Sequence, residues 1–541
     1  MAEPVPAAVV EPDGGRATAG PRPPAAWPVV VAAWTLLVAT SLAARPLLPV
    51  DETRYLSVAW EMWRDGDFLV PHLNGQPYSH KPPLLFWLFQ VGWAAFGVSA
   101  WWPRLVSPLC ALATLALVPA LARRLWPGRP GIAALAPLVL SGGLLWCVFT
   151  TFVMFDLLLT VCVALALLGV ALAWRGAPRR GWTLAALGLG LGALAKGPVV
   201  LASVLPVMLL APWWMASGPR PRWGRWYAGA GSALLGAHAL ALAWALPAAR
   251  SGGPAYTREI LFGQTSGRLV QSFAHQRPWW WYLALAPFAL FPYVAWPPSW
   301  RAAAGLRRRS GDGGIRFCLA VVVPAFVAFS AISGKQEHYL LSLLPAVALL
   351  LAAGFEAAPP HRGPRAPALW VAGLGALVLG APIFLPGRLP AWVEPASLAS
   401  GACLLVAGAG LAWLGGRRAT WRLETLHAVT LAVVVALHLG LAIAAPAFDP
   451  RPVAAHLRRL EAAGHPLAFA GTYHGEFQFL GRLERPLAVL HPGMERRWLE
   501  DHPGGRVVAV YARVPPHDLP APELEMPYRG QRLAIWTLGV P

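Results

Sequence analysis

The feature that most constrains this fold is a long series of apolar segments, most of them near the length that spans a lipid bilayer. A membrane-spanning helix needs roughly 20 consecutive apolar residues. Thirteen segments are expected to span: residues 27–44, 105–122, 131–149, 154–174, 182–195, 198–215, 228–248, 279–300, 316–332, 338–355, 367–385, 396–415 and 424–446. With 57% hydrophobic and 13% charged residues, the chain is too apolar to bury its surface as a soluble domain. The sequence therefore predicts an α-helical polytopic membrane protein with about 13 transmembrane helices.

The segment at residues 82–97 decides the topology of everything that follows it. It falls short of the length needed to cross, so we interpret it as an interfacial or re-entrant helix. If the N-terminus is cytoplasmic, every loop then predicted inside contains arginine, as the positive-inside rule requires. These arginines are Arg123, Arg124 and Arg129; Arg175, Arg179 and Arg180; Arg220, Arg222 and Arg225; Arg301 and Arg307 to Arg309; Arg362 and Arg365; and Arg417, Arg418 and Arg422. Counting 82–97 as a span would send the later clusters outside, so thirteen spans are favoured.

The two ends of the chain differ from the apolar middle. Residues 1–26 are rich in Pro, Ala and Gly, which predicts a disordered cytoplasmic tail. The first apolar segment ends in "SLAARP", a faint signal-peptidase pattern, but the many later apolar segments favour an uncleaved anchor. Residues 27–446 are predicted to form the transmembrane domain, with an external loop of interfacial helices at 45–104. Residues 447–541 alternate short apolar runs with amphipathic segments, which predicts a small soluble, extracytoplasmic α/β domain.

Charge and cysteine content narrow the class further. The net charge of +19 comes from small arginine clusters between apolar segments, and such clusters are typical of cytoplasmic loops rather than of one nucleic-acid-binding face. Anionic membrane lipids are therefore the expected partner, and nucleic acid is not. The five cysteines all lie in apolar runs and their number is odd, so they predict no disulfide framework.

The remaining polar residues gather on one predicted side of the membrane. They are Asp51, Glu52, Arg54, His80, Lys81, Asp156, Lys196, His275, Arg277, Lys335, Glu337 and His338. The chain contains only three lysines, and all three belong to this set. Acids, bases and cations at one membrane face predict a site that handles a lipid-linked anionic substrate.

Six short motifs in this order carry a family resemblance: "DETRY", "YSHKPPLLFW", "TTFVMFD", "LAKGP", "HQRPWWWYL" and "KQEHYLLSLLPA". Over residues 27–355 the chain resembles the aminoarabinose transferase (ArnT)-like and protein O-mannosyltransferase-like glycosyltransferases. The resemblance implies the GT-C glycosyltransferase fold and a polyprenyl-phosphate-linked sugar donor. It also implies a lipid A-like, glycan or protein acceptor, and a site on the periplasmic or outer face of a bacterial inner membrane.

The resemblance also implies roles for individual residues. Asp51 is the expected catalytic carboxylate and Asp156 a second acidic group. Arg54, Lys81 and Arg277 are expected to hold the donor phosphate. Further substrate-binding candidates are Tyr55, Lys196, Lys335 and Tyr339. At His80 the chain departs from the aminoarabinose enzymes, which typically carry Glu before the Lys, and this leaves donor identity and any metal site open.

The chemistry is consistent with these roles without the resemblance. Breaking the anomeric bond leaves a phosphate, so nearby cations stabilise the developing charge while a carboxylate takes the proton of an attacking hydroxyl. A single displacement would invert the anomeric centre. No cofactor is required, although His80 and His275 could bind Zn²⁺ together with a carboxylate or water.

Each residue also has a structural interpretation. Asp51 and Glu52 would suit a helix start, Arg54 could reach lipid headgroups, and Lys81 could anchor the interface. Asp156 could be a solvated cap, the other lysines loop charges, and the tyrosines part of an aromatic belt. A flippase or transporter for a lipid-linked saccharide is the main alternative function, but it predicts inverted repeats and mid-membrane charges, and neither is found. A non-catalytic scaffold is the remaining class.

Overall fold

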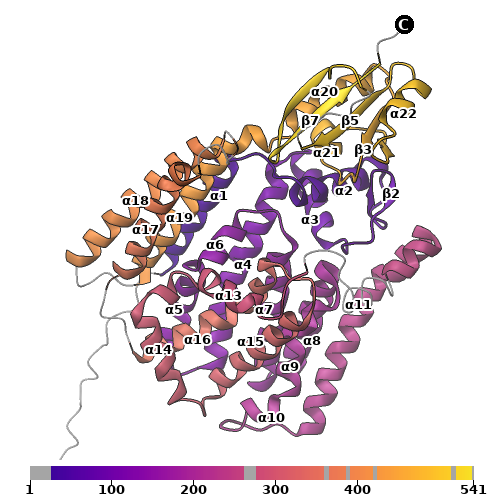
Figure 1. Cartoon of the computed structure of the whole chain (residues 1–541). Helices are drawn as coiled ribbons and strands as arrows, with labels where there is room; N and C mark the ends of the chain where they lie inside the picture. The colour runs from indigo at the N-terminus through magenta and orange to yellow at the C-terminus, as the bar shows by residue number, and fades with distance from the viewer. Residues whose placement is uncertain are drawn as a thin grey trace, which may run out of the picture.

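Helices make up most of the computed structural model, and a small sheet lies near the C-terminal end (Figure 1). The structure describes residues 26–260, 276–358, 363, 365–385, 390, 392–417, 423–512 and 519–538. The predicted N-terminal tail lies outside these residues, apart from its last residue.

Ten helical stretches among the described residues are long and apolar enough to cross a membrane, and the bent pair α5 and α6 would make eleven. The helices in these stretches are α1 (Ala26–Ala44), α4 (Trp101–Leu125), α5 (Pro130–Ser141), α6 (Leu144–Thr150), α7 (Phe155–Trp174), α8 (Pro178–Lys196), α9 (Val200–Leu209), α11 (Trp223–Arg258), α15 (Gly313–Ala331), η4 (Glu337–Leu343), α16 (Leu344–Ala357), α17 (Arg365–Phe384), α18 (Val393–Arg417), α19 (Leu423–Ala444), η5 (Ala445–Ala447) and α20 (Arg451–Ala462). The α-helical membrane class is thus confirmed, with ten or eleven candidate stretches in the described residues against the predicted count of about thirteen.

The first departure from thirteen concerns residues 182–215, predicted as two spans and found as one apolar stretch broken at η1 (Gly197–Val199). The contacts show that the chain turns back at this break. Lys196 at the end of α8 is bonded to Asp156 at the start of α7. The ring of Trp214, in α10 (Ala211–Trp214), packs 5.1 Å from that of Trp174 at the end of α7. The segment therefore traverses the length of α7 twice, as predicted.

The second departure concerns residues 279–300, which form α13 (Trp281–Ala289), η3 (Tyr293–Ala295) and the first residues of α14 (Pro297–Arg307) instead of one helix. Prolines interrupt the apolar run, and a proline inside a helix removes a backbone donor and clashes with the preceding turn. Neither helix alone has the length of a span.

The loop after α1 folds into two short helices that lie at one end of the bundle. These are α2 (Asp51–Asp65) and α3 (Leu84–Phe96), separated by the small antiparallel hairpin β1 (His72–Leu73) and β2 (Gln76–Pro77). At 13 residues α3 is too short to be a candidate span, in agreement with its interpretation as an interfacial or re-entrant helix. Leu85, Phe86 and Phe89 of α3 are fully buried and pack with α2 in one hydrophobic cluster.

The C-terminal region has the predicted α/β character. Its strands β3 (Leu467–Ala470), β4 (Ala488–Leu490), β5 (Arg506–Tyr511), β6 (Leu524–Tyr528) and β7 (Gln531–Trp536) form a sheet in the order β4-β3-β5-β7-β6. β3 is parallel to β4 and β5, and β7 is antiparallel to β5 and β6. The helices of this region are α20, α21 (Gln478–Gly481) and α22 (Glu495–Asp501). The buried stripe Val453, Leu457 and Leu460 of α20 belongs to the same hydrophobic cluster as side chains of the sheet.

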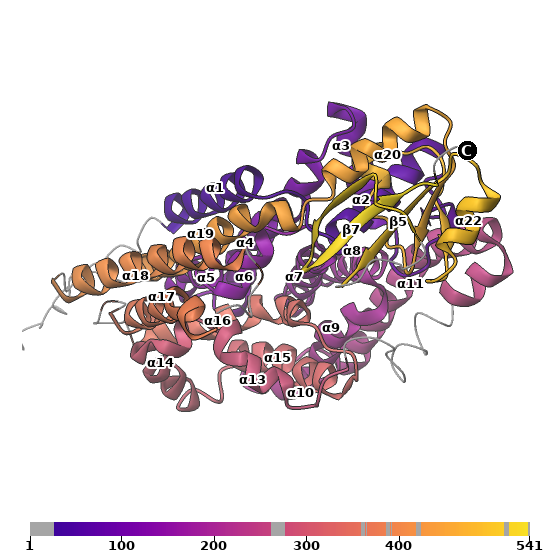
Figure 2. The same ribbon diagram turned by 45° about the horizontal axis from the view of Figure 1, so that its top comes forward.

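This C-terminal region lies against α2, which positions the start of that helix (Figures 1 and 2). Ser57 donates to the carbonyl of Gly475 (2.6 Å) and accepts from the backbone N–H of Phe479 (3.1 Å). The Trp60 indole donates to the carbonyl of Leu483 (3.1 Å). The helix that begins with Asp51 is therefore fixed between the membrane bundle and the sheet region.

Candidate functional site

A buried ion pair ties the start of α2 to the chain that leads into α7. Arg45 donates to both carboxylate oxygens of Glu52, at 2.5 and 2.9 Å. Glu52 also accepts from the backbone N–H groups of Leu48 and Val153, both at 2.8 Å. Arg45 donates in addition to the carbonyl of Thr151. Glu52 thus holds together the backbone at Leu48 and at Val153. Asp51 and Asp156 each lie three residues after one of these two points, so the ion pair fixes the chain segments that lead to both.

Asp51 is the first residue of α2, and its side chain is 46% exposed. It pairs with Arg54 one helical turn later, whose side chain is 21% exposed. Tyr55 beside them is buried, and burial raises its pKa well above the usual range, with the negative charges of Asp51 and Asp156 adding to the effect. Both carboxylates therefore act on the same phenol.

The Phe155 ring joins the elements of the site. It makes edge contacts with Tyr55 of α2 (4.9 Å between centroids) and with Phe86 of α3 (5.5 Å). The ammonium of Lys81 lies 5.4 Å from its centroid. Since Phe155 directly precedes Asp156 and Tyr55 lies on the helix that Asp51 begins, this ring joins Lys81 to the two helices that carry the acidic residues.

Asp156 is buried at the start of α7, with a lysine and a histidine beside its carboxylate. Its Oδ1 accepts from the Lys196 ammonium at 2.5 Å, and its Oδ2 lies 3.7 Å from Nε2 of His338. The Lys196 ammonium also lies 4.3 Å from the centroid of Tyr339. The motifs "TTFVMFD", "LAKGP" and "KQEHY" are thus brought together, and Asp156 is not the solvated cap that the sequence left open.

Arg277 and Lys335 lie together, and hydrogen bonds to backbone carbonyls join the two segments that carry them. The Lys335 ammonium donates to the carbonyls of Arg277 (3.0 Å) and Ile332, and Arg277 N–H donates to the carbonyl of Ser333 (3.1 Å). Lys335 is buried whereas Arg277 is exposed. These contacts favour a role for Lys335 in joining two loops, with the Arg277 guanidinium near Trp281 (5.9 Å).

The predicted metal ligands cannot be compared with one another, because His275 lies outside the described residues. His80 is exposed, and its ring lies 5.1 Å from that of Tyr78. Within the part of the chain that the structure describes, no group of three or more His, Cys, Asp or Glu side chains is arranged to hold a metal ion.

Three residues of the site were missed as functional candidates. His338 was noticed as a polar loop residue in "KQEHY", yet its contact with Asp156 had no signal in the sequence. The Tyr78 ring lies 6.4 Å from that of Phe86 in the aromatic cluster, and Arg45 completes the Glu52 pair. Arg45 directly follows the first apolar segment, and a charged residue at that place is expected at the boundary of any span. Its sequence position therefore gave no sign of the pair with Glu52.

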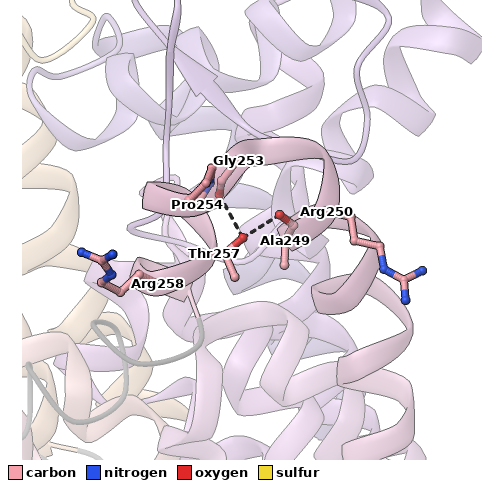
Figure 3. Close-up of a pocket in the computed structure, with 6 residues that line it drawn as sticks. All are labelled: Ala249, Arg250, Gly253, Pro254, Thr257 and Arg258. Atoms are coloured by element: carbon pink, nitrogen blue, oxygen red, sulfur yellow. Dashed lines mark hydrogen bonds between the residues drawn. The ribbon is translucent and has the colours of Figure 1, made fainter.

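A cavity of about 420 Å³ lies elsewhere, at a kink in α11, and takes its lining from that helix alone (Figure 3). Gly253, with φ of 81°, forms the kink, and Thr257 donates to the carbonyls of Ala249 (2.6 Å) and Gly253 (2.9 Å). The guanidinium groups of Arg250 and Arg258 point in opposite directions (Figure 3). This cavity has no acid–cation pair and is not part of the candidate site.

The comparisons with known proteins point in the same direction. The family profile described as dolichyl-phosphate-mannose-protein mannosyltransferase matches residues 80–247. An undecaprenyl phosphate-alpha-4-amino-4-deoxy-L-arabinose arabinosyl transferase of Pseudomonas aeruginosa is 31% identical over 407 residues, covering 73% of this chain and 71% of that protein. The transferase of the same name from Edwardsiella ictaluri is 30% identical over 61% of this chain and 59% of its own length.

Among solved structures, ArnT from Cupriavidus metallidurans bound to undecaprenyl phosphate superimposes with a TM-score of 0.72. The superposition covers 95% of this chain and 98% of that one, at 19% identity. The overall fold, including the C-terminal region, is therefore shared with that protein.

Proposed function

This chain belongs to the family of undecaprenyl phosphate-aminoarabinose arabinosyl transferases, which are membrane glycosyltransferases, and from that membership we propose the reaction of its site. The protein transfers a sugar from a polyprenyl-phosphate donor to an acceptor at the external face of the inner membrane. The family favours undecaprenyl phosphate as the lipid carrier and a lipid A-like acceptor. A glycan or a protein hydroxyl would serve the same chemistry.

The observation that carries this proposal is one partly exposed carboxylate with cations around it. Asp51 pairs with Arg54, and the Lys81 ammonium lies 5.4 Å from the Phe155 ring, which also contacts Tyr55 on the helix of Asp51. A phosphate leaving group needs cations near its oxygen, since charge develops there in the transition state. Arg54 suits a phosphate through its planar fork, and Lys81 through its compact charge.

In the proposed reaction Asp51 is the general base. The donor phosphate draws the Arg54 guanidinium from Asp51, which leaves the carboxylate able to take the proton of the acceptor hydroxyl. That oxygen attacks the anomeric carbon, the anomeric C–O bond breaks, and the polyprenyl phosphate departs with the bonding electrons. One displacement inverts the anomeric centre.

Asp156 has a different part in the proposal, because it is buried and paired with Lys196. A carboxylate held in this way has little freedom to accept a proton, but it fixes Lys196 and His338 beside the site. We propose that this group positions substrate polar groups with Tyr339. Tyr55 is buried under the site and supports Asp51 rather than stacking on a sugar.

The proposed reaction requires no metal, and Zn²⁺ binding by His80 and His275 is a separate proposal. Imidazole is a good zinc ligand, but a site needs further ligands in tetrahedral geometry. Elemental analysis of the purified protein tests it directly: absence of stoichiometric metal would end the idea.

The proposal is tested by Asp51→Asn in purified protein supplied with a synthetic polyprenyl-phosphate sugar. Because the Asp51 side chain is partly exposed, the variant is expected to fold normally while transfer is abolished. Asp65→Asn, which changes an exposed acid at the other end of the same helix, is the matched control. Near-normal turnover by Asp51→Asn would refute the base assignment. Mass spectrometry of lipid and glycoprotein fractions from cells with and without the gene would identify the acceptor.

A further inference from the structure

A cluster of arginines lies at the same end of the bundle, and it shares Arg45 with the ion pair that supports the site described above. It lines a cavity of about 250 Å³ where the end of α1, the start of α4 and the junction between α19 and α20 meet. The cationic members are Arg45, Arg104 and Arg451. Four separate segments contribute to this cavity, the fourth being α21 with Leu480.

The charges of this cavity do not cancel. Glu52 pairs with Arg45, and Asp449 pairs with Arg451 at 2.7 Å. Within the described residues, Arg104 forms no ion pair with a carboxylate, and its Nη2 donates to the carbonyl of Ser41. Three guanidinium groups against two carboxylates leave one positive charge.

Two of the arginines also have a guanidinium N–H group without a hydrogen-bond partner. The Nε atoms of Arg45 and Arg104 are buried, and neither has a hydrogen-bond partner. The Arg45 side chain is itself almost completely buried. A buried unpaired donor on a charged group costs free energy, and the negative charge of an anion in the cavity would offset part of that cost through space.

The walls of the cavity indicate the kind of anion. Leu42, Leu47, Ala100 and Leu480 supply apolar surface beside the guanidinium groups. The cavity also lies at the ends of three candidate spans, α1, α4 and α19, the level at which lipid headgroups meet a membrane protein. A phosphodiester with apolar chains attached fits both the charge and the walls.

We propose that this cavity binds the phosphate of an anionic glycerophospholipid headgroup. The site is distinct from the proposed donor-phosphate group of Arg54 and Lys81, because none of its lining residues belongs to that group. The lipid phosphate accepts hydrogen bonds from Arg104 and Arg451, and its acyl chains continue along the outer surfaces of α1 and α4. The proposal does not depend on sugar transfer.

The test uses full-length purified protein in nonionic detergent, mixed with phosphatidylglycerol or phosphatidylcholine, with the bound fraction read by native mass spectrometry. The wild type is expected to retain phosphatidylglycerol in preference, because the choline cation opposes the net positive charge of the cavity. Arg104→Gln is expected to weaken phosphatidylglycerol binding roughly ten- to hundredfold, since it removes charge-assisted hydrogen bonds.

The controls separate this site from general surface charge. Arg458→Gln removes one exposed positive charge from the same helix as Arg451 but outside the cavity, and should leave binding unchanged. Arg451→Gln, at a well-exposed side chain, decides the question if Arg104→Gln fails to fold, and should also weaken binding. Equal affinity of the wild type for the two lipids, or unchanged binding in folded cavity variants, would overturn the proposal. Displacement of the lipid by an equal concentration of inorganic phosphate would identify a free-phosphate site instead.

Discussion

Asp51 and Glu52 are neighbours in the sequence, but the fold gives their carboxylates opposite environments. The Asp51 side chain is 46% exposed, whereas that of Glu52 is 3% exposed and accepts from one guanidinium and two backbone N–H groups. Because these groups already occupy both oxygens of the Glu52 carboxylate, it has no room for an acceptor hydroxyl. The family resemblance alone pointed to Asp51 as the candidate base, and the burial of Glu52 favours the same choice.

Glu52→Gln is expected to destabilise the protein strongly near neutral pH. The variant leaves the Arg45 charge buried without its counter-ion, a change that typically costs about 3–5 kcal/mol. Thermal unfolding of purified protein in detergent at pH 7 measures the loss. Asp65→Asn breaks an exposed ion pair on the same helix and should change stability by about 1 kcal/mol or less. Similar midpoints for both variants would contradict the role of this buried pair.

The same pair predicts a pH dependence with a definite sign. Burial alone would raise the pKa of Glu52, but the charge of Arg45 and the hydrogen bonds from Arg45, Leu48 and Val153 lower it below 4.5. Since the folded pKa is the lower one, the stabilisation is present above pH 4.5 and is lost as pH falls through the folded pKa. The stability difference between wild type and Glu52→Gln should therefore shrink below pH 4.5. A constant difference from pH 7 to pH 3 would refute this.

Substitutions of Lys81 test whether phosphate binding needs an ammonium at this point or only a positive charge. Lys81 precedes two prolines, which restrict the local backbone and hold the ammonium near the Phe155 ring. Lys81→Ala should lose about 1.5–3 kcal/mol of transition-state stabilisation, roughly ten- to hundredfold in transfer efficiency. Lys81→Arg should rescue only part of this loss, because the longer planar group cannot occupy the same point.

Steady-state transfer from a synthetic polyprenyl-phosphate sugar measures the Lys81 series. Lys335→Met is the matched control, since the Lys335 ammonium donates to two backbone carbonyls. It should lower stability while leaving the KM for donor near the wild-type value. Full activity in Lys81→Arg would show that any cation at this position is sufficient.

At the scale of elements, the hairpin β1–β2 links α2 to the C-terminal sheet region through one side chain. Asn74 Oδ1 accepts from Gln478 Nε2 and from Leu487 N–H, both at 2.8 Å, and its Nδ2 donates to the Leu487 carbonyl at 2.9 Å. Glu61 of α2 accepts from the backbone N–H groups of Asn74 and Gly75. The position of α2 therefore depends on a region far away in the sequence.

Asn74→Gly is expected to loosen this connection. Asn74 has a positive φ of 54°, which glycine adopts without strain, so the variant removes the side chain alone. It leaves the Gln478 amide and the Leu487 N–H and carbonyl without the Asn74 side chain as partner. Each of these groups that stays buried should lower the free energy of unfolding by about 1–3 kcal/mol. Limited proteolysis should then release the C-terminal region faster than from the wild type.

Asn74→Asp provides the comparison for that experiment. It keeps an acceptor at Oδ1 and loses only the bond from Nδ2, so its cleavage rate should lie closer to that of the wild type. Equal protection of Asn74→Gly and the wild type would show that apolar contacts such as the stacked Trp93 and Phe479 rings suffice to hold the region.

These element contacts mark the limit of what the sequence could predict. Apolar runs predicted most of the helices, and "PLAFAG", "RVVAVYAR" and "RLAIWTL" predicted β3, β5 and β7, because burial patterns are local in the chain. The C-terminal region is held on α2 and on the β1–β2 hairpin by hydrogen bonds to the backbone carbonyls of Gly475, Leu483 and Leu487. Every residue type has such a carbonyl, so the sequence gives no sign of these contacts. The breaks around Pro287 and Pro292 turned one predicted span into two short helices.

At the scale of the whole molecule, charged side chains divide between the two ends of the bundle. The acid–cation site lies at the start of α7, whereas Arg175, just past the other end of α7, donates to the carbonyls of Arg124 and Leu125. Arg309 likewise donates to the carbonyl of Ala353, near the end of α16 that is away from His338. The predicted cytoplasmic arginines of these loops therefore lie at the end opposite the site.

This separation predicts which positions a membrane-impermeant thiol reagent can reach in intact cells. Single cysteines replacing Arg179 and Arg308, both exposed at the arginine-rich end, should resist labelling until the membrane is permeabilised. Cysteines replacing Asp65 and Glu500, exposed on α2 and α22 at the site end, should be labelled at once. The background would carry alanine at the five native cysteines.

The pattern of labelling decides more than orientation, because Arg179 and Arg308 bracket the two segments, 182–215 and 279–300, that depart from single uninterrupted spans. Arg179 precedes the α8–α9 turn, and Arg308 follows the interrupted stretch from α13 to α14. If residues 182–215 crossed once while 279–300 still crossed, the two positions would lie on opposite sides and only one would be protected. Protection of both, with labelling at 65 and 500, requires an even number of crossings between residues 179 and 308 and places the site outside. Labelling of both arginine positions with protection at 65 and 500 would invert the molecule and put the proposed transfer on the wrong face of the membrane.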